Sequence, residues 1–296
     1  MHHGWILAGR QGLGKRTFAD AAARELLGAD GSQEHHPDIL ILTYGPKDEK
    51  EEKKAADGKE YERARSIRIG QIRQMQQRLT TRPTLGDKRV VIIDPADDME
   101  RNASNALLKS LEEPPEGTFF LLVTHRPAQL LPTIRSRCRV LRFNPLSQDE
   151  LVQELKSSMP ETDGAALADA VQFAGGSPGS AQQFVEQDLG SIAQVMRTLI
   201  AEGDRTLKAR GELAARIGAR PDRERLQAIL TLARNLTADA AAQADPRQRL
   251  ALIDAHSELV ALTRQAPTFN FDPGLLAMEI GTLLASACAA SERANV

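Results

Sequence analysis

The sequence predicts an α/β domain built on a parallel sheet and followed by helices alone. Over the first 145 residues, short apolar segments typical of buried strands alternate with helical patterns, which is characteristic of a parallel sheet covered by helices on both faces. A glycine-rich turn joins the first strand to the first helix. From residue 146 onward no strand pattern appears, and apolar residues recur at helical spacing.

Five segments of the first half have the length and composition of buried strands. They are Gly4–Ala8, the apolar part of "HPDILILT" (36–43), Lys88–Asp94, "TFFLLVT" (118–124) and "RVLRF" (139–143). Between them we expect three longer helices, and a short helix that leads to "SRC" (136–138). One runs to about Leu27, one lies in "SIRIGQIRQMQQRL" with Ser66 as its N-cap, and a long one covers 96–113 until Pro114 ends it.

The segment 46–65 is densely charged, with seven basic and seven acidic side chains between Lys47 and Arg65. Its net charge is therefore zero. A balanced run of this kind is typical of a solvated helix or a surface insertion rather than of a basic patch. We assign it no chemistry.

The helical second half has its own boundary signals. Ser147 and Glu150 have capping-box spacing, which predicts the start of a new helix. The glycines of "AGGSPGSA" (174–181) and the change near Leu189 and Gly190 predict further breaks. We therefore expect three domains: an α/β domain at 1–145, a small helical domain at 146–188 and a larger helical domain at 189–296.

Composition excludes several classes of protein. With 38 basic and 40 acidic residues the formal charge is -2, so the chain has no global electrostatic signature of nucleic-acid binding. Aromatic residues make up only 4%, which argues against a binder that stacks single-stranded bases. Cys138 and Cys288 are too few for a disulfide framework or a four-cysteine metal site. No apolar run approaches about 18 residues, and we expect a cytoplasmic protein.

The turn after the first strand matches seven of the eight positions of the phosphate-binding loop G-x-x-x-x-G-K-[ST]. Gly9, Gly12 and Gly14 would let the backbone approach phosphates, and Lys15 would reach the β and γ phosphates. The strand and helix on either side provide the context that this motif requires. The alternative is a glycine-rich turn between strand and helix that binds nothing.

The eighth position departs from the motif. Arg16 stands where a Ser or Thr would bind magnesium, and Thr17 lies about 100° further round the helix. At the end of the strand 88–94, Asp94 fits the second magnesium-binding position. Pro95 follows it, and a proline can neither accept a proton nor position a water.

Three further groups have two interpretations each. Asp97 and Asp98 either cap the next helix, which we favour, or replace the missing catalytic acid. Thr124 ends a strand, and its hydroxyl either makes a structural bond or contacts a γ-phosphate. Arg137 is either a surface ion-pair partner or a guanidinium presented to a neighbouring subunit's nucleotide.

Six segments stand out when they are read together: "GRQGLGKRT", "HPDILIL", "VVIIDPADDM", "NALLKSLEEPPEGTFFLLVT", "LLPTIRSRC" and "GGSPGSA". Over roughly residues 4 to 185 they closely resemble bacterial clamp-loader subunits of the AAA+ class, and the run 105–115 with the later "SRC" is very specific to that family. The resemblance implies a P-loop AAA+ domain, a small helical lid domain and an all-α C-terminal collar that serves oligomerisation.

Departures from the family pattern indicate which branch the chain resembles. Motor subunits would have Thr or Ser at 16, an Asp-Glu pair at 94 and 95, and an arginine near 180. This chain has Arg16, Pro95 and Ser180 instead. It thus resembles the delta-prime family of non-hydrolysing DNA polymerase III subunits.

That resemblance implies an accessory polymerase subunit without intrinsic ATPase activity. It would act as a stator and lend Arg137 in trans as an arginine finger. The implied partners are the gamma/tau motor subunits and delta, and indirectly the sliding clamp and the primed DNA on which it is loaded. We expect no required cofactor and at most weak binding of ATP or ADP at Gly9, Gly12, Gly14, Lys15, Thr17, Asp94 and Thr124.

Many members of this family carry a four-cysteine zinc module before the "HPD" strand. The corresponding "GADGSQEHH" (28–36) contains no cysteine, and the adjacent His35 and His36 point opposite ways on an extended chain, so we expect no zinc and no other metal. The arm that usually precedes the glycine loop is expected to be short or missing, which weakens the expectation of tight nucleotide binding.

Two other functions remain open. The first is an active clamp-loader ATPase of the gamma/tau type, in which Thr17 and Asp97 or Asp98 take over the missing roles. The second is a stand-alone P-loop enzyme such as a nucleotide kinase, which the helical last third disfavours.

Overall fold

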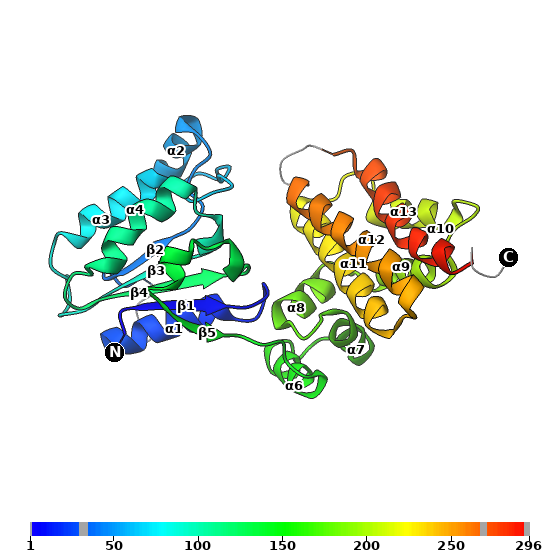
Figure 1. The fold of residues 1–296 in the computed structure, drawn as a ribbon, viewed down its shortest axis with the longest axis horizontal. Coiled ribbons are helices and arrows are strands. Elements are labelled where there is room, and N and C mark those ends of the chain that lie inside the picture. The colour runs from blue at the N-terminus through cyan, green and yellow to red at the C-terminus, as the bar shows by residue number, and fades with distance from the viewer. Residues whose placement is uncertain (1, 30–34, 267–270, 293–296) are drawn as a thin grey trace. The chain divides into compact units, whose positions relative to one another are not determined.

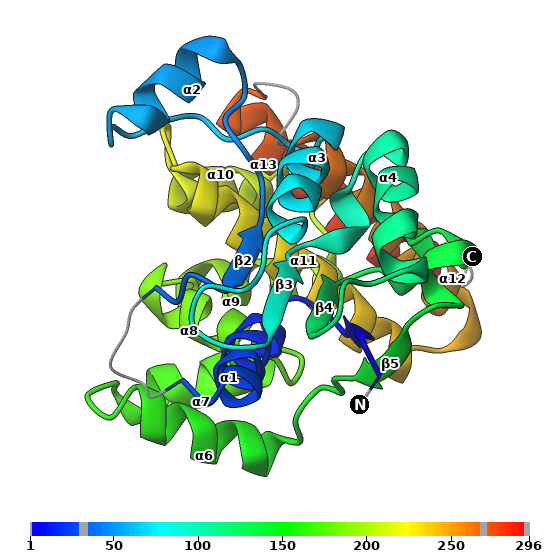
Figure 2. The same ribbon diagram turned by 90° about the vertical axis from the view of Figure 1, so that its left-hand side faces the viewer.

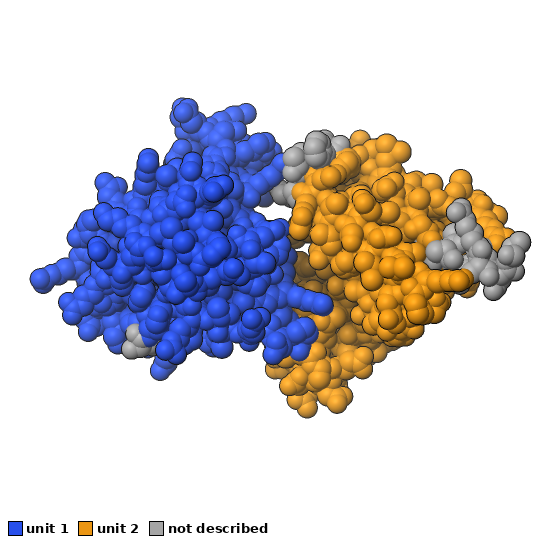
Figure 3. All heavy atoms as spheres, viewed as in Figure 1, with its two compact units in different colours: residues 1–145 blue, residues 146–296 orange. Residues whose placement is uncertain are grey.

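The computed structural model describes residues 2–29, 35–266 and 271–292 (Figure 1). The chain forms two compact units, Met1–Pro145 and Leu146–Val296 (Figure 3). The first unit has a sheet covered by helices, and the second consists of helices in its described residues. Each unit has its own buried core.

The five strands that the structure describes in the first unit are all parallel. They are β1 (Gly4–Ala8), β2 (Ile39–Leu42), β3 (Arg89–Ile93), β4 (Thr118–Thr124) and β5 (Arg139–Arg142), in the spatial order β2-β3-β4-β1-β5. The predicted parallel sheet is therefore confirmed. Parallel neighbours cannot be joined by a tight hairpin, so the chain crosses over the sheet between consecutive strands. The order also places β4 between β1 and β3.

Helices pack on both faces of this sheet (Figures 1 and 2). On one face lies α1 (Lys15–Leu27); on the other lie α3 (Ile69–Leu79) and α4 (Arg101–Glu112). Successive residues of β3 point to opposite faces. Val90 and Ile92 accordingly belong to the core with α1, whereas Val91 and Ile93 belong to the core with α3 and α4.

The single helix predicted over 96–113 is wrong. A short 3₁₀ turn (Ala96–Asp98) comes first, then an extended Met99, and α4 begins only at Arg101 with Glu100 at its N-cap. The cause is a parallel bridge between Ile67 and Met99, in which the backbone amides of Ile67 and Glu100 donate across the bridge. This tertiary contact interrupts a sequence that is locally compatible with a helix.

The same bridge moves the start of α3. Its N-cap is Arg68 rather than the predicted Ser66, and the Arg68 amide donates to Gln71 Oε1 at 3.1 Å. The Ser66 hydroxyl donates instead to Glu100 at 2.9 Å. Ser66 therefore joins two segments and does not cap the helix.

The charged insertion contains a short helix, α2 (Glu49–Ala56). Asp48 caps it by accepting two backbone amides. Glu51 is buried, and its carboxylate accepts the Lys54 ammonium and the Glu62 amide, each at 2.7 Å. The insertion is thus fixed at its base by one acidic side chain while most of its other charges are exposed.

The second unit contains eight helices among its described residues. They are α6 (Gln148–Ser158), α7 (Gly164–Phe173), α8 (Pro178–Glu186), α9 (Gly190–Glu202), α10 (Lys208–Ile217), α11 (Arg223–Gln243), α12 (Pro246–Gln265) and α13 (Pro273–Glu292). The predicted capping box is confirmed, because Ser147 Oγ accepts the Glu150 amide and the Ser147 amide donates to Glu150 Oε2. No helix in the described part of the chain is long and apolar enough to cross a bilayer.

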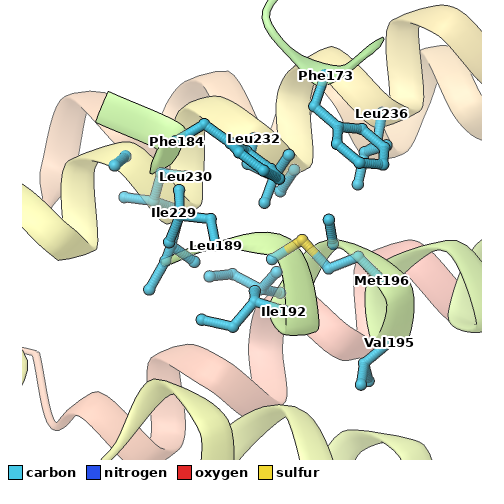
Figure 4. Packing of buried hydrophobic residues seen from close by; sticks show 14 of the residues in the cluster. Phe173, Phe184, Leu189, Ile192, Val195, Met196, Ile229, Leu230, Leu232 and Leu236 are labelled. Atoms are coloured by element: carbon cyan, nitrogen blue, oxygen red, sulfur yellow. The ribbon is translucent and has the colours of Figure 1, made fainter. Parts of the chain in front are cut away.

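One apolar cluster runs through these helices (Figure 4). Phe173 of α7 stacks on Phe184 of α8 with ring centroids 5.2 Å apart, and both pack in the same cluster as Met196 of α9 and Leu236 of α11. A division of this unit at residue 188 stays a prediction, since α7 and α8 share a core with the helices that follow.

A buried ion pair fixes the edge of the sheet opposite the glycine loop. Asp38 and Arg89 have side chains only 1% and 4% exposed. Asp38 accepts the backbone amides of Thr84 and Leu85 at 2.7 and 2.8 Å, and Arg89 donates to Asp38 and to carbonyls of the segment 78–82. Burial opposes ionisation of Asp38, but these bonds and the Arg89 charge outweigh it and keep its pKa below the usual value.

Replacing Asp38 with alanine should lower the free energy of unfolding of the first unit by about 3–5 kcal/mol at pH 7, because Arg89 would stay buried without its partner. Trp5, the one tryptophan of the chain, lies in β1 and reports this unit's unfolding by fluorescence. The pKa of Asp38 is lower in the folded chain than in the unfolded one. The contribution of Asp38 to the free energy of unfolding is therefore complete above about pH 3.9, which is the pKa of an aspartate in the unfolded chain. This contribution is lost as the pH falls through the lower pKa of Asp38 in the folded chain.

The matched control is the exposed Asp87, whose change to alanine should cost less than about 0.5 kcal/mol. Equal losses for Asp38→Ala and Asp87→Ala would contradict a stabilising role for the buried pair.

Candidate functional site

Three parallel strands bring the candidate residues to one edge of the sheet. Ala8 at the end of β1 is in register with Thr124 at the end of β4, and Ile93 at the end of β3 is in register with Leu122. The Gly9 amide donates to the Thr124 carbonyl at 3.3 Å. The carboxyl edge of an open parallel sheet is where such folds bind ligands. Gly9, Asp94 and Thr124 therefore lie at the same edge of the sheet.

The loop needs glycine at two positions for different reasons. A Cβ on Gly9 would lie 2.5 Å from the Phe143 carbonyl oxygen, so the backbone packs too closely for a side chain. Gly14, at the N-cap of α1, has φ +72°, a left-handed conformation that other residues seldom adopt. Gly12 lies between them with φ +79°.

Lys15 is folded back onto its own loop. Its side chain is buried, and Nζ donates to the Arg10 carbonyl oxygen at 2.5 Å. Burial lowers the pKa of Lys15 to about 8, against the opposing effect of the Asp94 and Asp97 carboxylates. The ammonium that would meet a phosphate thus already has a partner within the chain.

Arg16 also has partners within the chain. Its Nε is 2.8 Å from Asp20 Oδ2, one helical turn along α1, and its Nη1 is 3.5 Å from Asp94 Oδ2. The two positions that would hold a magnesium ion in a P-loop NTPase are therefore joined by an ion pair. Thr17 is exposed on α1.

The predicted capping role of Asp97 and Asp98 is wrong, because Glu100 is the N-cap of α4. Asp97 accepts the His125 amide and the Arg126 Nε, each at 3.0 Å. Asp98 accepts Arg126 Nη2 and the Tyr44 hydroxyl, each at 2.5 Å.

The pKa values of this network follow from its hydrogen bonds. Burial disfavours ionisation of Asp97, yet bonds from His125, Arg126 and Thr124 keep its pKa below the usual value. Burial and the bond to Asp98 raise the pKa of Tyr44. Both aspartates thus accept hydrogen bonds from one arginine, Arg126, which the sequence analysis did not single out. The sequence offered one signal for Arg126, which is that it lies two residues after Thr124, at the end of a strand.

Thr124 belongs to the same network. It is buried, its carbonyl accepts the Gly9 amide, and its Oγ1 accepts the Arg126 amide at 3.3 Å. Its hydroxyl also bonds Asp97. Contact with a γ-phosphate stays a prediction for this residue.

Arg137 lies between α5 (Pro132–Arg135) and β5, beside the end of α4. Its guanidinium is 2.5 Å from Glu112 Oε1 and donates to the Thr133 carbonyl oxygen at 2.9 Å. The side chain is one-third exposed, at 33%. The next residue, Cys138, is half-buried, and burial raises the pKa of its thiol to about 11, which keeps the thiol protonated at neutral pH.

The segment 28–36, where we expect no zinc, lies partly outside the described residues, which omit 30–34. Among the described residues no group of three His, Cys, Asp or Glu side chains could hold a metal ion. His36 Nδ1 accepts the Asp38 amide, and His35 is exposed. Ser180 lies in the first turn of α8, in the second unit.

Comparison with known proteins assigns the family. A family model described as "DNA polymerase III, delta subunit" matches residues 1–147. Subunit delta' of DNA polymerase III from Pseudomonas aeruginosa is 34% identical over 221 residues, which are 69% of this chain and 61% of that protein. The chain belongs to the clamp-loader family of DNA polymerase III.

Other members of the clamp-loader family match as well. Subunit delta' of Escherichia coli is 33% identical over 47% of this chain and 42% of its own length. DNA polymerase III subunit gamma of Buchnera aphidicola is 30% identical over 63% and 51%. The chain thus spans less than two thirds of these relatives. A gamma subunit-related protein of Thermotoga maritima aligns over 97% of this chain and 95% of its own, with 21% identity and a TM-score of 0.47.

The Lys15 ammonium should titrate near pH 8, against an ordinary value of 10.5, because burial disfavours its charged form. The measurement is an NMR pH titration after reductive ¹³C-methylation of the lysines, with Lys15→Arg to assign the signal. Asp97→Asn should lower the pKa of Lys15 further, since the Asp97 charge raises it. A Lys15 signal that titrates near 10.5 would show that the side chain leaves the loop for solvent.

Proposed function

We propose that this clamp-loader chain does not hydrolyse ATP and acts as a stator that supplies Arg137 to a neighbouring subunit's nucleotide. The observation that supports this most strongly is the state of the carboxylates at the loop edge. Asp94 pairs with Arg16, Asp97 accepts His125 and Arg126, and Asp98 accepts Arg126 and Tyr44.

Hydrolysis needs a group that orients or deprotonates the attacking water. Pro95 stands in the position after Asp94 where a motor subunit would have a glutamate, and Asp97 and Asp98 are committed to Arg126. Replacing the missing acid with either aspartate would break a charge-assisted hydrogen bond and leave a half-buried arginine without that partner. We therefore disfavour the active-motor alternative, although relatives named gamma and tau also match.

Arg137 is suited to act outside its own chain. Its planar guanidinium offers five donors in a fixed geometry that fits phosphate oxygens. Glu112 and the Thr133 carbonyl hold the side chain in one place while a third of it stays exposed. An arginine finger supplied in trans accelerates hydrolysis by about 10³ to 10⁵ in NTPases. The subunit could thus control turnover elsewhere without a catalytic site of its own.

The proposed partners follow from the family. They are the gamma/tau motor subunits and delta, with the sliding clamp and primer-template DNA contacted through the assembly. The formal charge of -2 is compatible with this, because DNA inside a multi-subunit complex can be held by a few local contacts. No cofactor is required in this role.

The purified chain should show no ATP turnover above a no-protein background, because Pro95 replaces the glutamate of a motor subunit and Asp97 and Asp98 are paired with Arg126. A phosphate-release assay at saturating MgATP measures this. The control is Lys15→Ala, which removes the loop cation. Turnover by the chain that this substitution abolishes would overturn the non-hydrolysing role.

Arg137→Ala should leave assembly with the other subunits intact and lower the DNA-stimulated ATPase of the reconstituted complex. The loss at the one affected active site should approach the factor of about 10³ expected for an arginine finger. Size-exclusion chromatography and steady-state ATPase assays measure the two properties.

The matched control is Arg135→Ala, which removes a nearby exposed arginine at the end of the preceding helix, α5. Glu112→Gln tests the positioning pair, since it keeps Arg137 but removes its carboxylate partner. If complexes with Arg137→Ala hydrolysed ATP as fast as those with Arg135→Ala, Arg137 would have no role in trans.

A further inference from the structure

A divalent metal in a P-loop NTPase is held between two protein positions. One is the hydroxyl directly after the loop lysine, and the other is the acid at the end of a neighbouring strand. In this chain the two positions are Arg16 and Asp94, and their side chains are in contact, with Nη1 3.5 Å from Oδ2. The Arg16 side chain therefore lies between the loop and the end of β3, where a P-loop NTPase would hold its metal ion.

The residues present do not fit magnesium. Mg²⁺ requires oxygen ligands at 2.0–2.1 Å in octahedral geometry. A guanidinium has donors only and always carries its charge. An ion bound to Asp94 at such a distance would lie against the Arg16 guanidinium, which would repel it.

Arg16 is held in this position from two sides. Asp20 accepts its Nε at 2.8 Å from one turn further along α1, while Asp94 reaches it from β3. The Arg16 side chain is 35% exposed and the Asp94 side chain 19% exposed. Two acceptors on different elements orient the guanidinium plane, which a single mobile surface pair would not do.

The charges of the loop also balance without a metal. Lys15 and Arg16 contribute two positive charges, and Asp20 and Asp94 contribute two negative ones. A divalent ion would add two positive charges next to carboxylates that are already paired. The Asp94 carboxylate therefore already has a cationic partner before any metal arrives.

We propose that Arg16 is a built-in cation that replaces the divalent metal of this loop, so that any phosphate ligand is bound here without magnesium. The inference rests on the proposed function in treating the loop as non-catalytic, but it concerns a separate property, which is what balances the charge of Asp94. It follows that the metal site is latent: restoring a hydroxyl at position 16 should free Asp94 and make the loop respond to Mg²⁺.

The test is the thermal midpoint of the full chain, followed by Trp5 fluorescence with saturating ADP in either MgCl₂ or EDTA at matched ionic strength. For the wild type we expect midpoints that agree within about 1 °C. For Arg16→Thr we expect a midpoint higher in Mg²⁺ by about 2–4 °C, which corresponds to roughly tenfold tighter binding. Arg16→Ser provides the same hydroxyl if the threonine variant does not fold.

Two controls tie the response to this ion pair. Arg16→Lys keeps a cation beside Asp94 and should stay insensitive to Mg²⁺. Arg16→Thr combined with Asp94→Asn removes the carboxylate ligand and should abolish the gained response.

A Mg²⁺-dependent rise in the wild type that Asp94→Asn removes would overturn the inference, as would hydroxyl variants that respond no more than the wild type. Neither result bears on the non-hydrolysing role, which fails only if the chain turns over ATP in a manner dependent on Lys15.

Discussion

The candidate site depends on one constraint, the parallel alignment of β1, β3 and β4. Parallel strands place their carboxyl ends at the same edge, so the glycine loop, the aspartate after β3 and the threonine that ends β4 come together. The bond from the Gly9 amide to the Thr124 carbonyl joins two of these ends directly. The charged contacts of Lys15, Arg16 and Arg126 are arranged around this edge.

At that edge the chain satisfies its own charges. Lys15 donates to a carbonyl of its loop, Arg16 pairs with Asp94 and Asp20, and Arg126 holds Asp97 and Asp98. In an NTPase, such groups meet phosphate, metal and water. Here each has a partner supplied by the chain. This internal pairing is compatible with the proposed role, in which the architecture of a nucleotide-binding domain persists without hydrolysis.

We therefore assign the proposed functional role to Arg137 rather than to the glycine loop. That residue lies beside the end of α4, where Glu112 fixes its guanidinium without enclosing it. Because an arginine finger stabilises charge that develops on another subunit's nucleotide, it needs position and exposure rather than a pocket of its own. Membership of the clamp-loader family supports the proposal that such a neighbouring subunit exists.

The sequence by itself determined the strands, the glycine loop and the capping box at Ser147, because each depends on residues that are close in the chain. Apolar runs specify buried strands, and fixed spacings specify loops and caps. The break before α4 and the cap of α3 were not predictable, since both come from the bridge between Ile67 and Met99. The burial of Glu51 also depends on a distant partner, the backbone amide of Glu62, which follows α2 in the sequence.

For the site, the sequence located the edge residues but not their bonds. Arg16 was recognisable as a departure from the loop motif, yet only the tertiary structure pairs it with Asp94 across the sheet edge. Asp97 and Asp98 looked like helix caps because their local context permits it; the fold instead brings Arg126 and Tyr44 to them. Local sequence fixes which groups are present, whereas the energy of a charged pair depends on distance and burial, which the packing of remote segments decides.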